Sequence, residues 1–433
     1  MKSKLILLTL FLPLVLSGCV LSANVETLIE PPKLNAQQQD IYNALKSYTG
    51  ENIVLNYPKA GKYLSAFIIE NIDDDEENEA IVFYKKNAAK SDDDSLRINI
   101  LDTTDSKWHS VYDHTANGNE IEQVEITNLG DSDKINIIAG YSLINQNEKK
   151  LSIYDYSDGK LNAYLSDEPY SVFQTIDLNN DGTKELFTAC EKTSSKSASA
   201  VSLHLYGDGK YKRSELSFDN LYTSYCNIVT GTDVNGETQI FLDSHTGDEN
   251  IVTEVLKADA NNNLLSEFSP DINKAQTHRT HAYRSADIDN DGKAEIPVPY
   301  FCEGYDENSV NPIFFTSWYE LKNKQLKHKY ESYTSITDGY VFIIPTDWYG
   351  KVTAKTDISK NEISLCSGNE PETAQEIFTV KVVSGKEIST ISEETGWTLI
   401  RTKGEKHFFL KINETNPLAL SPEELVMKFK FDY

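Results

Sequence analysis

The sequence predicts a mainly β protein, in which a β-propeller of about five four-stranded blades is followed by a small C-terminal α+β domain. Three observations predict this class. An acidic loop motif recurs through the middle of the chain, Asp-Gly turns separate runs of alternating apolar and polar residues, and no useful helical period occurs between Ser65 and Tyr333. Alternation with a period of two is typical of half-buried strands, and a repeated unit indicates a repeat architecture.

The acidic motif is clearest in Asp177–Leu186 and Asp287–Ile296, which both read Asp-x-Asp/Asn-x-Asp-Gly-x-x-Glu-aliphatic. A weaker copy begins at Asn71, and two decayed copies begin, by register, at Asn128 and Gly231. The five first positions lie 49 to 57 residues apart. A unit of this length matches one four-stranded propeller blade.

Within each unit, strands and turns follow in the order that a blade needs. An apolar run such as Ala80–Tyr84 leaves the acidic loop, and two more strand-like runs follow with a turn between them. Two of these turns contain Asp158-Gly159 and Asp208-Gly209. Asp-Gly between alternating runs is a strong hairpin signal, which supports an antiparallel unit.

The first residues of the chain predict export. Residues 1–18 read as a signal peptide, because Lys2 and Lys4 precede an apolar run that is too short for a comfortable membrane span. Leu16-Ser17-Gly18-Cys19 resembles the bacterial lipobox, so we expect cleavage before Cys19 and a diacylglycerol on its sulfur. The alternative is an ordinary signal peptide, or an uncleaved anchor, with an incidental cysteine.

Three further segments complete the expected domain organisation. Residues 19–33 lack a clear period and are expected to form a lipidated tether, and residues 34–50 read as a helix that Asn35 caps and Gly50 ends. The propeller is expected over residues 51–339. Residues 340–433 read as a small α+β domain with an antiparallel sheet and a short helix, for which Ser421 is the cap and Glu424 occupies the capping-box position.

Composition limits the partners of the chain. The 433 residues include 41 lysines and arginines and 67 aspartates and glutamates, for a net charge of −26. Such a charge repels nucleic acid and anionic head groups, so we expect no nucleic acid partner and contact with a membrane through the lipid anchor alone. We expect a monomer, held at the external face of the cell membrane.

Four cysteines remain after Cys19. They allow three disulfide pairings, and the sequence does not choose among them. Each lies within or beside a strand-like run, which slightly favours free thiols in the core. They are Cys190, Cys226, Cys302 and Cys366.

The two complete loops and their spacing resemble the FG-GAP or VCBS repeats, the blade type of integrin α-chain heads and of many bacterial surface proteins. The resemblance covers roughly Ser65 to Gly339. The Phe-Gly and Gly-Ala-Pro marks of the family are mostly absent, so the resemblance is to the blade architecture. The order of lipobox, short helix, acidic repeats and C-terminal domain is also similar to that of uncharacterised lipoproteins of Gram-positive anaerobes.

The acidic loops have the pattern of a calcium site. Calcium takes six to eight hard oxygens, and a tight loop with Gly at position 6 can direct positions 1, 3, 5 and 9 and the carbonyl of position 7 inward. An EF-hand is excluded, because it needs flanking helices and a Glu at position 12. The expected ligands in the third unit are Asp177, Asn179, Asp181, Glu185 and the carbonyl of Thr183; those in the fifth are Asp287, Asp289, Asp291, Glu295 and the carbonyl of Lys293.

The first loop is a weaker candidate for calcium. Its ligands would be Asn71, Asp73, Asp75 and Glu79, but Asn71 replaces the first aspartate and Glu76 replaces the glycine. The second and fourth loops lack the needed acids. The alternative for all these loops is a solvated acidic turn. We expect any bound ion to be structural, because a loop that uses its ligands on one ion leaves no open catalytic position.

The sequence favours a binding protein over an enzyme. It contains no HExxH, GxSxG or P-loop motif, and its conspicuous carboxylates are assigned to the ion loops. The leading hypothesis is a non-enzymatic surface module that binds a protein or a glycan. One alternative is an exported polysaccharide hydrolase or lyase, because paired acids from different blades could meet. Another is a purely structural envelope protein.

Overall fold

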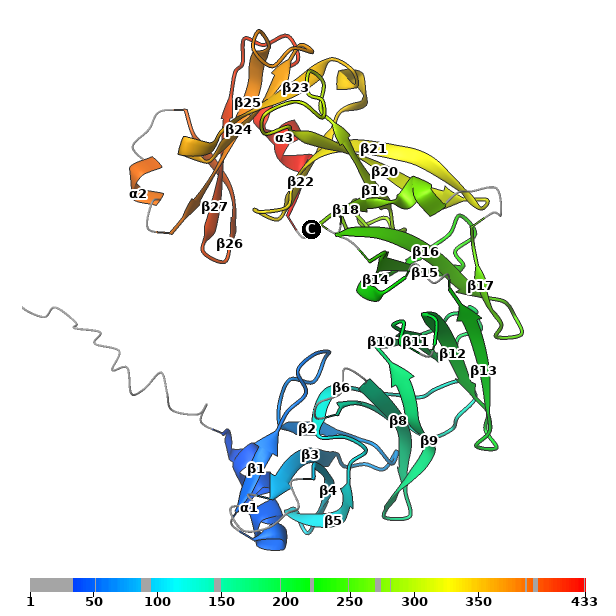
Figure 1. Cartoon of the computed structure of the whole chain (residues 1–433). Coiled ribbons are helices and arrows are strands. Elements are labelled where there is room, and N and C mark those ends of the chain that lie inside the picture. Colours follow the sequence, from blue (N-terminus) through cyan, green and yellow to red (C-terminus); the bar gives the residue numbers. More distant parts are fainter. Residues whose placement is uncertain are drawn as a thin grey trace, which may run out of the picture.

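The computed structural model describes residues 34–50, 52–86, 95–143, 149–194, 196–218, 222–247, 249–268, 274–280, 282–385, 388–391, 396–431 and 433 (Figure 1). The expected signal peptide, the tether and Cys19 lie outside this part of the chain. The described chain is mainly β, with 54% strand and 8% helix, which confirms the class. Its strands form six antiparallel sheets, and none of these sheets is closed.

The first three sheets are built from strands that follow one another in the chain. In the first sheet β1 and β2 pair end to end with one edge of β3. The first sheet contains β1 (Ile53–Asn56), β2 (Phe67–Glu70), β3 (Glu79–Lys86), β4 (Arg97–Thr104) and β5 (Lys107–Thr115). The second contains β6 (Glu120–Thr127), β7 (Asn136–Ser142), β8 (Lys149–Ser157) and β9 (Lys160–Tyr170). The third contains β10 (Val172–Ile176), β11 (Glu185–Cys190), β12 (Ser199–Leu205) and β13 (Tyr211–Ser217).

Each of the last three sheets has five strands. The fourth contains β14 (Ser224–Thr232), β15 (Thr238–His245), β16 (Asn250–Ala258), β17 (Leu264–Ser266) and β18 (Arg279–Thr280). The fifth contains β19 (Ile296–Phe301), β20 (Phe314–Lys322), β21 (Gln325–Ser335), β22 (Tyr340–Ile344) and β28 (Phe429–Lys430). The sixth contains β23 (Val352–Asp357), β24 (Glu362–Ser367), β25 (Gln375–Ser384), β26 (Thr398–Lys403) and β27 (Lys406–Ile412).

The fifth sheet departs from the four-stranded unit that the sequence predicts. Its first strand is reduced to a single bridge between Ala286 and Glu295. At the opposite edge β22 pairs with β21, and β28 pairs with β22. The expected boundary at residue 340 therefore falls where β22 begins, and β22 belongs to the fifth sheet, not to a separate C-terminal domain.

Successive sheets pack against each other through strands that are apolar on both faces. On β7 the side chain of Ile137 packs toward Phe83 of the first sheet, whereas that of Ile138 packs toward Leu203 of the third. Neighbouring side chains of a strand point to opposite faces, so a strand between two sheets must be apolar at every position. This explains why the run after each acidic loop is continuously apolar and does not alternate.

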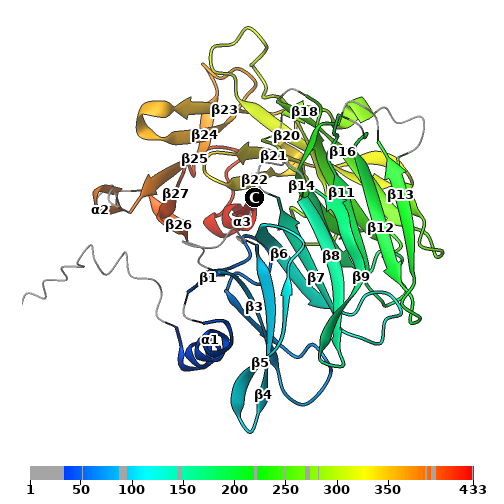
Figure 2. The ribbon, with the colours of Figure 1, turned by 60° about the horizontal axis from the view of Figure 1, so that its bottom comes forward.

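The sheets follow one another in an open arc (Figures 1 and 2). Helix α1 (Ala36–Thr49) packs its Ile41 and Leu45 against Ala80, Val82 and Leu101 of the first sheet. The sixth sheet covers the fifth, through a core in which Phe342 contacts Phe378 with ring centroids 4.8 Å apart. Other elements thus cover both end faces of the five-sheet series, and a closed ring of five blades is not confirmed.

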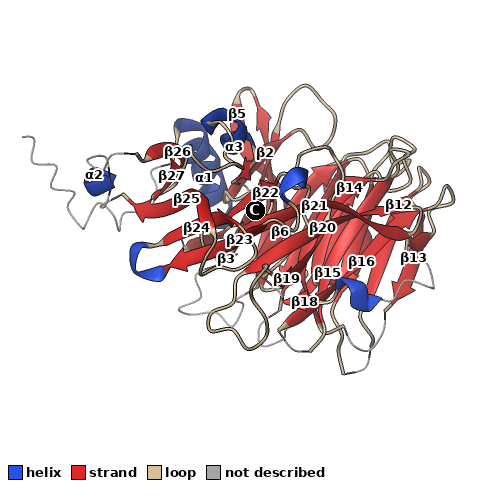
Figure 3. Cartoon of the chain, turned by 90° about the horizontal axis from the view of Figure 1, so that it is seen from above, coloured by secondary structure: helices blue, strands red, loops and turns tan. Residues whose placement is uncertain are grey.

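Helices contribute little to this fold (Figure 3). The predicted caps of α1 are confirmed: the Asn35 side chain accepts a hydrogen bond from the Gln38 N–H, and Gly50 ends the helix at φ 89°. The predicted capping box of α3 (Pro422–Met427) is also confirmed, between Ser421 and Glu424. The remaining helical segments are short: α2 (Ile388–Ile391), η2 (Lys274–Thr277), η3 (Thr346–Trp348) and η4 (Ile358–Lys360).

Candidate functional site

One hydrogen bond recurs in four of the five loops. The side chain at position 9 of the motif accepts a hydrogen bond from the backbone N–H of position 2, seven residues earlier, and so closes the base of the loop. The oxygen–nitrogen pairs are Glu79 Oε2–Ile72 N at 2.8 Å, Asn136 Oδ1–Leu129 N at 2.9 Å, Glu185 Oε2–Leu178 N at 2.8 Å and Glu295 Oε2–Ile288 N at 3.0 Å. In the three acidic loops, one oxygen of the glutamate therefore supports the loop and the other remains for a cation.

The third loop brings two of its predicted ligands, Asp181 and Glu185, together with a histidine that the sequence analysis did not single out. Asp177 accepts hydrogen bonds from the N–H groups of Asp181 and Gly182, at 3.1 and 3.0 Å. His204 on β12 is buried, and its Nδ1 lies 2.9 Å from Glu185 Oε1. Ligand atoms of Asp181, Glu185 and His204 lie within 4.8 Å of one another. This loop therefore pairs carboxylates with an imidazole, which is not a hard oxygen ligand.

Two other predicted ligands of the third loop have local partners. The side-chain amide of Asn179 donates a hydrogen bond to Asp181 Oδ2 at 2.7 Å. The backbone N–H of Thr183 donates to Asp181 Oδ1 at 2.8 Å, as does that of Lys293 to Asp291 in the fifth loop at 2.9 Å. The two residues that were expected to supply carbonyls thus also hold the aspartate at position 5 of their loop in place.

The fifth loop surrounds a lysine. Asp287, Asp289 and Asp291 offer oxygens within 4.8 Å of one another. Lys329 Nζ of β21 lies 3.0 Å from Asp289 Oδ2, 2.9 Å from Asp291 Oδ2 and 2.7 Å from Glu295 Oε1. Burial opposes the charge of Lys329, but the hydrogen bonds to Glu295, Asp291 and Asp289 raise its pKa well above the usual range. Burial raises the pKa of Glu295 to about 7, and the hydrogen bond from Lys329 opposes this rise.

The first loop, the weakest candidate by sequence, holds a buried carboxylate oxygen without a partner. Asp73, Asp75 and Glu79 offer oxygens within 4.8 Å of one another. Glu79 is fully buried, and its Oε1 has no hydrogen-bond partner among the described residues. Burial raises the pKa of Glu79 to about 7, and the charges of Asp73, Asp102 and Asp75 add to the rise. Asn71 closes the loop, because its amide oxygen accepts from the Asp74 N–H at 2.7 Å.

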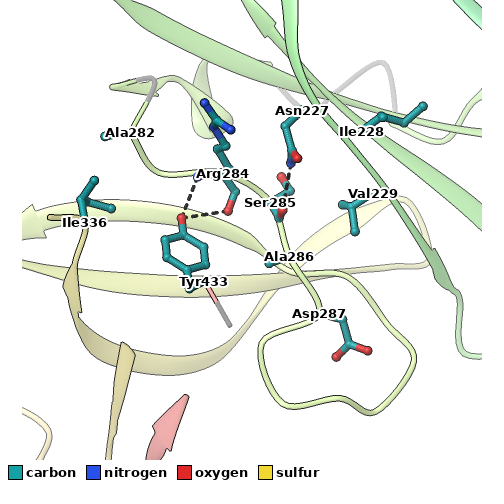
Figure 4. A pocket seen from close by; sticks show the side chains of 10 residues that line it. All are labelled: Asn227, Ile228, Val229, Ala282, Arg284, Ser285, Ala286, Asp287, Ile336 and Tyr433. Carbon is teal, nitrogen blue, oxygen red and sulfur yellow. Dashed lines mark hydrogen bonds between the residues drawn. The ribbon is translucent and has the colours of Figure 1, made fainter. Parts of the chain in front are cut away.

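A pocket of about 650 Å³ lies beside the fifth loop (Figure 4). It is lined by Asn227–Val229 of β14, Ala282, Arg284–Asp287, Ile336 and Tyr433. The Tyr433 hydroxyl donates to the backbone carbonyl of Arg284 at 2.9 Å and accepts from its N–H at 2.7 Å, which fixes the backbone and leaves the guanidinium exposed. Arg284 forms no ion pair within the described part of the chain.

Below this pocket lies a buried polar network that has no free reactive group. Arg279 Nη2 lies 2.8 Å from Asp243 Oδ1, and both side chains are fully buried. Ser285 and Asn227 also donate to Asp243, at 2.8 and 2.9 Å. Each donor is matched by an acceptor, so this network holds the segment before the fifth loop against the fourth sheet.

The described cysteines do not offer a nucleophile. All four are free thiols in the structure. Burial raises the pKa of Cys190 and of Cys302 to about 12, and that of Cys366 to about 11. Burial also raises the pKa of Cys226. A thiol, and not a thiolate, is therefore present at neutral pH, which is typical of structural cysteines.

Comparisons with known proteins leave the function open. No family model matches the chain, and no curated protein matches it. Among solved structures, a protein of unknown function from Dyadobacter fermentans has 10% identity and a TM-score of 0.27, covering 84% of this chain and 98% of that one. The GH93 α-L-arabinofuranosidase of Fusarium graminearum has 10% identity and a TM-score of 0.29, covering 75% and 96%. The polysaccharide lyase Uly1 has 9% identity and a TM-score of 0.27, covering 85% and 95%. Likenesses this weak carry no argument about function.

One further feature concerns membranes. Among the helices that the structure describes, none has the length and apolar character needed to span a bilayer.

Proposed function

We propose that this chain is an exported lipoprotein, anchored through Cys19, whose series of sheets is an open form of the predicted propeller and binds a protein or a glycan at the cell surface. The observation that carries the binding proposal is the pocket of about 650 Å³ with the guanidinium of Arg284 at its wall, which forms no ion pair with any residue that the structure describes. Ligand pockets commonly combine apolar walls with a few placed polar groups. Arginine binds planar carboxylates in a bidentate manner, so the proposed ligand bears a carboxylate.

The chemistry of the pocket favours binding over catalysis. The carboxylate that lines the pocket is that of Asp287, which already accepts hydrogen bonds from Asp291 N at 3.1 Å and Gly292 N at 2.9 Å. No second carboxylate lines the pocket in the described structure. Hydrolysis of a glycosidic bond by the usual route needs two carboxylates across the bond. The hydrolase alternative therefore lacks its pair of carboxylates in this pocket.

A binding assay with one charge change tests this proposal. Acidic glycans that contain uronic acids and acidic peptides are screened on arrays, and the best ligand is titrated against the wild type and the Arg284→Gln variant. Loss of a buried or partly buried charged hydrogen bond costs about 1.5–3 kcal/mol, so affinity should fall roughly 10- to 150-fold. Lys327→Gln, which removes the same charge from an exposed position on β21, is the control and should bind normally.

Three outcomes would contradict all or part of this proposal. Release of reducing sugar from a polysaccharide by the purified protein would contradict the binding proposal in favour of the hydrolase. Equal affinity of the wild type and the Arg284→Gln variant would mean that the ligand does not bind through Arg284 in this pocket. Absence of any ligand in both screens and in a pull-down would favour a structural envelope protein.

Calcium is the proposed structural ion of this protein. The carboxylates of the first loop fit it, because they are hard oxygens from one tight loop and one of them, Glu79 Oε1, lacks a partner among the described residues. An ion there would neutralise like charges and add to folding stability. Extracellular calcium is on the order of millimolar, which is the range in which weak loops of exported proteins fill.

A further inference from the structure

The first and fifth acidic loops carry the same four carboxylates at matching positions. In both, the loop supplies an aspartate at position 3, an aspartate at position 5 and the glutamate at position 9. The fourth acid follows from strand register, because Ala80 pairs with Leu101 as Ile296 pairs with Tyr319, and an acid follows each partner. The matched acids are Asp73 and Asp289, Asp75 and Asp291, Glu79 and Glu295, and Asp102 and Glu320.

The next strand carries a β-bulge at the same place in both sheets. A bulge inserts one extra residue and re-aims its side chain. The extra residue is Lys329 in the fifth sheet and Val111 in the first. The strand pairs on either side are Tyr319–His328 and Trp318–Tyr330 in the fifth sheet, and Leu101–Ser110 and Ile100–Tyr112 in the first.

In the fifth loop, the bulge lysine contacts all four acids. Besides Asp289, Asp291 and Glu295, Lys329 Nζ lies 3.2 Å from Glu320 Oε1. The ammonium therefore occupies the point where the four carboxylates converge, and its side chain is only 12% exposed. A divalent ion could bind these oxygens only by expelling this lysine. In the fifth loop, a strong calcium candidate by sequence, the point where these four carboxylates converge is thus already filled by a cation of the protein.

In the first loop, the same acids have no internal cation. Val111 cannot donate a hydrogen bond and is exposed. No ion pair to Asp73, Asp75, Glu79 or Asp102 is formed by the residues that the structure describes. Glu79 Oε1, which matches the oxygen bound by Lys329, is the buried atom without a partner.

We propose that the protein binds its divalent cation at the first acidic loop and not at the fifth, where the ammonium of Lys329 is a built-in replacement for the ion. This inference rests on the proposed calcium dependence and assigns it to one place. The residue at the bulge determines how the four acids are neutralised. A lysine there makes the stability of the loop independent of metal, and a valine leaves it dependent on a bound ion.

Exchanging the bulge residues tests this inference. Calcium stoichiometry is measured by equilibrium dialysis with calcium chloride, and Tm is measured in calcium and in excess chelator. Val111→Lys should bind one ion fewer than the wild type and should lose its sensitivity to chelator. Lys329→Met should bind one ion more than the wild type. Its Tm should be lower than that of the wild type in chelator, and calcium should restore it. If Val111→Lys does not fold, Glu79→Gln replaces it and should also bind one ion fewer.

The controls separate this inference from the proposed function. Lys327→Gln on the same strand should leave stoichiometry and chelator sensitivity unchanged. If Asp291→Asn binds one ion fewer than the wild type and Glu79→Gln binds the same number as the wild type, the inference is overturned, while the proposed calcium dependence is not. Lys329→Met with a lower Tm that calcium does not restore, and no added ion, would show an ordinary structural lysine and would also overturn it. A wild type that binds no calcium would overturn both the inference and the proposed calcium dependence, while ligand binding at Arg284 is measured independently.

Discussion

At the scale of single residues, Asp243 shows how a buried charge stabilises this fold. Its carboxylate accepts hydrogen bonds from Thr253, Arg279, Asn227 and both the hydroxyl and the N–H of Ser285, at 2.6 to 2.9 Å. Burial opposes its ionisation, but Arg279 and these donors lower the pKa of Asp243 below its usual value. The carboxylate of Asp243 is therefore stabilised in its charged form in the folded protein.

Removal of one partner of this pair should strongly destabilise the protein. Arg279→Met leaves a buried carboxylate without its cation, which costs about 3–5 kcal/mol of the free energy of unfolding. Urea denaturation followed by tryptophan fluorescence measures the loss. Asp243 contributes its stability above the unfolded pKa of about 3.9, and this contribution is lost as pH falls through the lower folded pKa. In Asp243→Asn, the free energy of unfolding should therefore fall less steeply as the pH is lowered. The same fall in the variant as in the wild type would contradict the role of this pair.

Other residues show why the candidate site could be predicted only in part. The acidic loops are local patterns, so the sequence identified the carboxylates. The side chains that contact two of these loops come from strands outside the loops: His204 is 19 residues from Glu185, and Lys329 is 34 residues from Glu295. His204 lies between two leucines in a strand-like run, and this was a local signal of an internal partner. Lys329 could not be identified in this way, because its position at a β-bulge is evident only once the pairing register of its strand is known.

At the scale of elements, the loops between strands link successive sheets. The N–H of Gly130 in the second loop donates to the carbonyl of Lys184 in the third, at 2.7 Å. The third loop meets the fourth where Asn180 Oδ1 accepts from Thr238 N at 2.8 Å. The fourth meets the fifth where Thr232 N donates to the Gly292 carbonyl at 2.8 Å. The loops at this edge of the arc therefore act together to hold the angle between sheets.

A substitution at Gly130 tests the importance of this link. A Cβ there would lie 2.1 Å from the carbonyl oxygen of Leu205, and the residue has a φ of +55°. Gly130→Ala should cost about 1–2 kcal/mol for the backbone conformation and more for the clash with the third sheet. Gly236→Ala is the control, because its φ of +82° carries the same kind of strain but nothing lies within 4 Å. Equal Tm losses for the two variants would mean that the contact contributes nothing.

The sequence predicts most elements correctly for local reasons and misses those with long-range causes. Hairpin turns such as Asp158-Gly159 and helix caps such as Asn35 are fixed by neighbouring residues, and they lie where the sequence places them. The fifth sheet could not be predicted in the same way. Its pairing of β22 with β28 joins residues nearly ninety positions apart, and no short-range pattern encodes that partner.

At the scale of the whole molecule, the ends of the sheet series decide its shape. A closed propeller packs its last blade against its first. Here α1 covers the outer face of the first sheet, and the sixth sheet covers the fifth. Neither face is free to meet the other, so the series remains open although the second and third sheets each have four consecutive antiparallel strands in chain order.

The C-terminal residues join three parts of this arc. Strand β28 extends the fifth sheet, and Phe429 contacts both Phe342 of that sheet and Phe378 of the sixth, with ring centroids 5.0 and 6.1 Å apart. Tyr433 packs its ring edge-on against Trp318 at 5.5 Å, and its hydroxyl bonds the backbone of Arg284. One short segment thus connects the sixth sheet, the fifth sheet and the wall of the pocket.

Two variants of Tyr433 should separate these connections. Tyr433→Phe removes the hydroxyl and leaves the Arg284 N–H and carbonyl to find other partners, at a cost of about 1–3 kcal/mol. Tyr433→Ala also removes the ring from Trp318, and large-to-small changes of aromatic residues cost about 3–5 kcal/mol. Because Trp318 reports on the ring, its fluorescence follows unfolding in urea directly. If both variants lose the same stability, the hydroxyl alone anchors the segment; the larger loss in Tyr433→Ala is expected because the ring fills the space between the fifth sheet and the pocket.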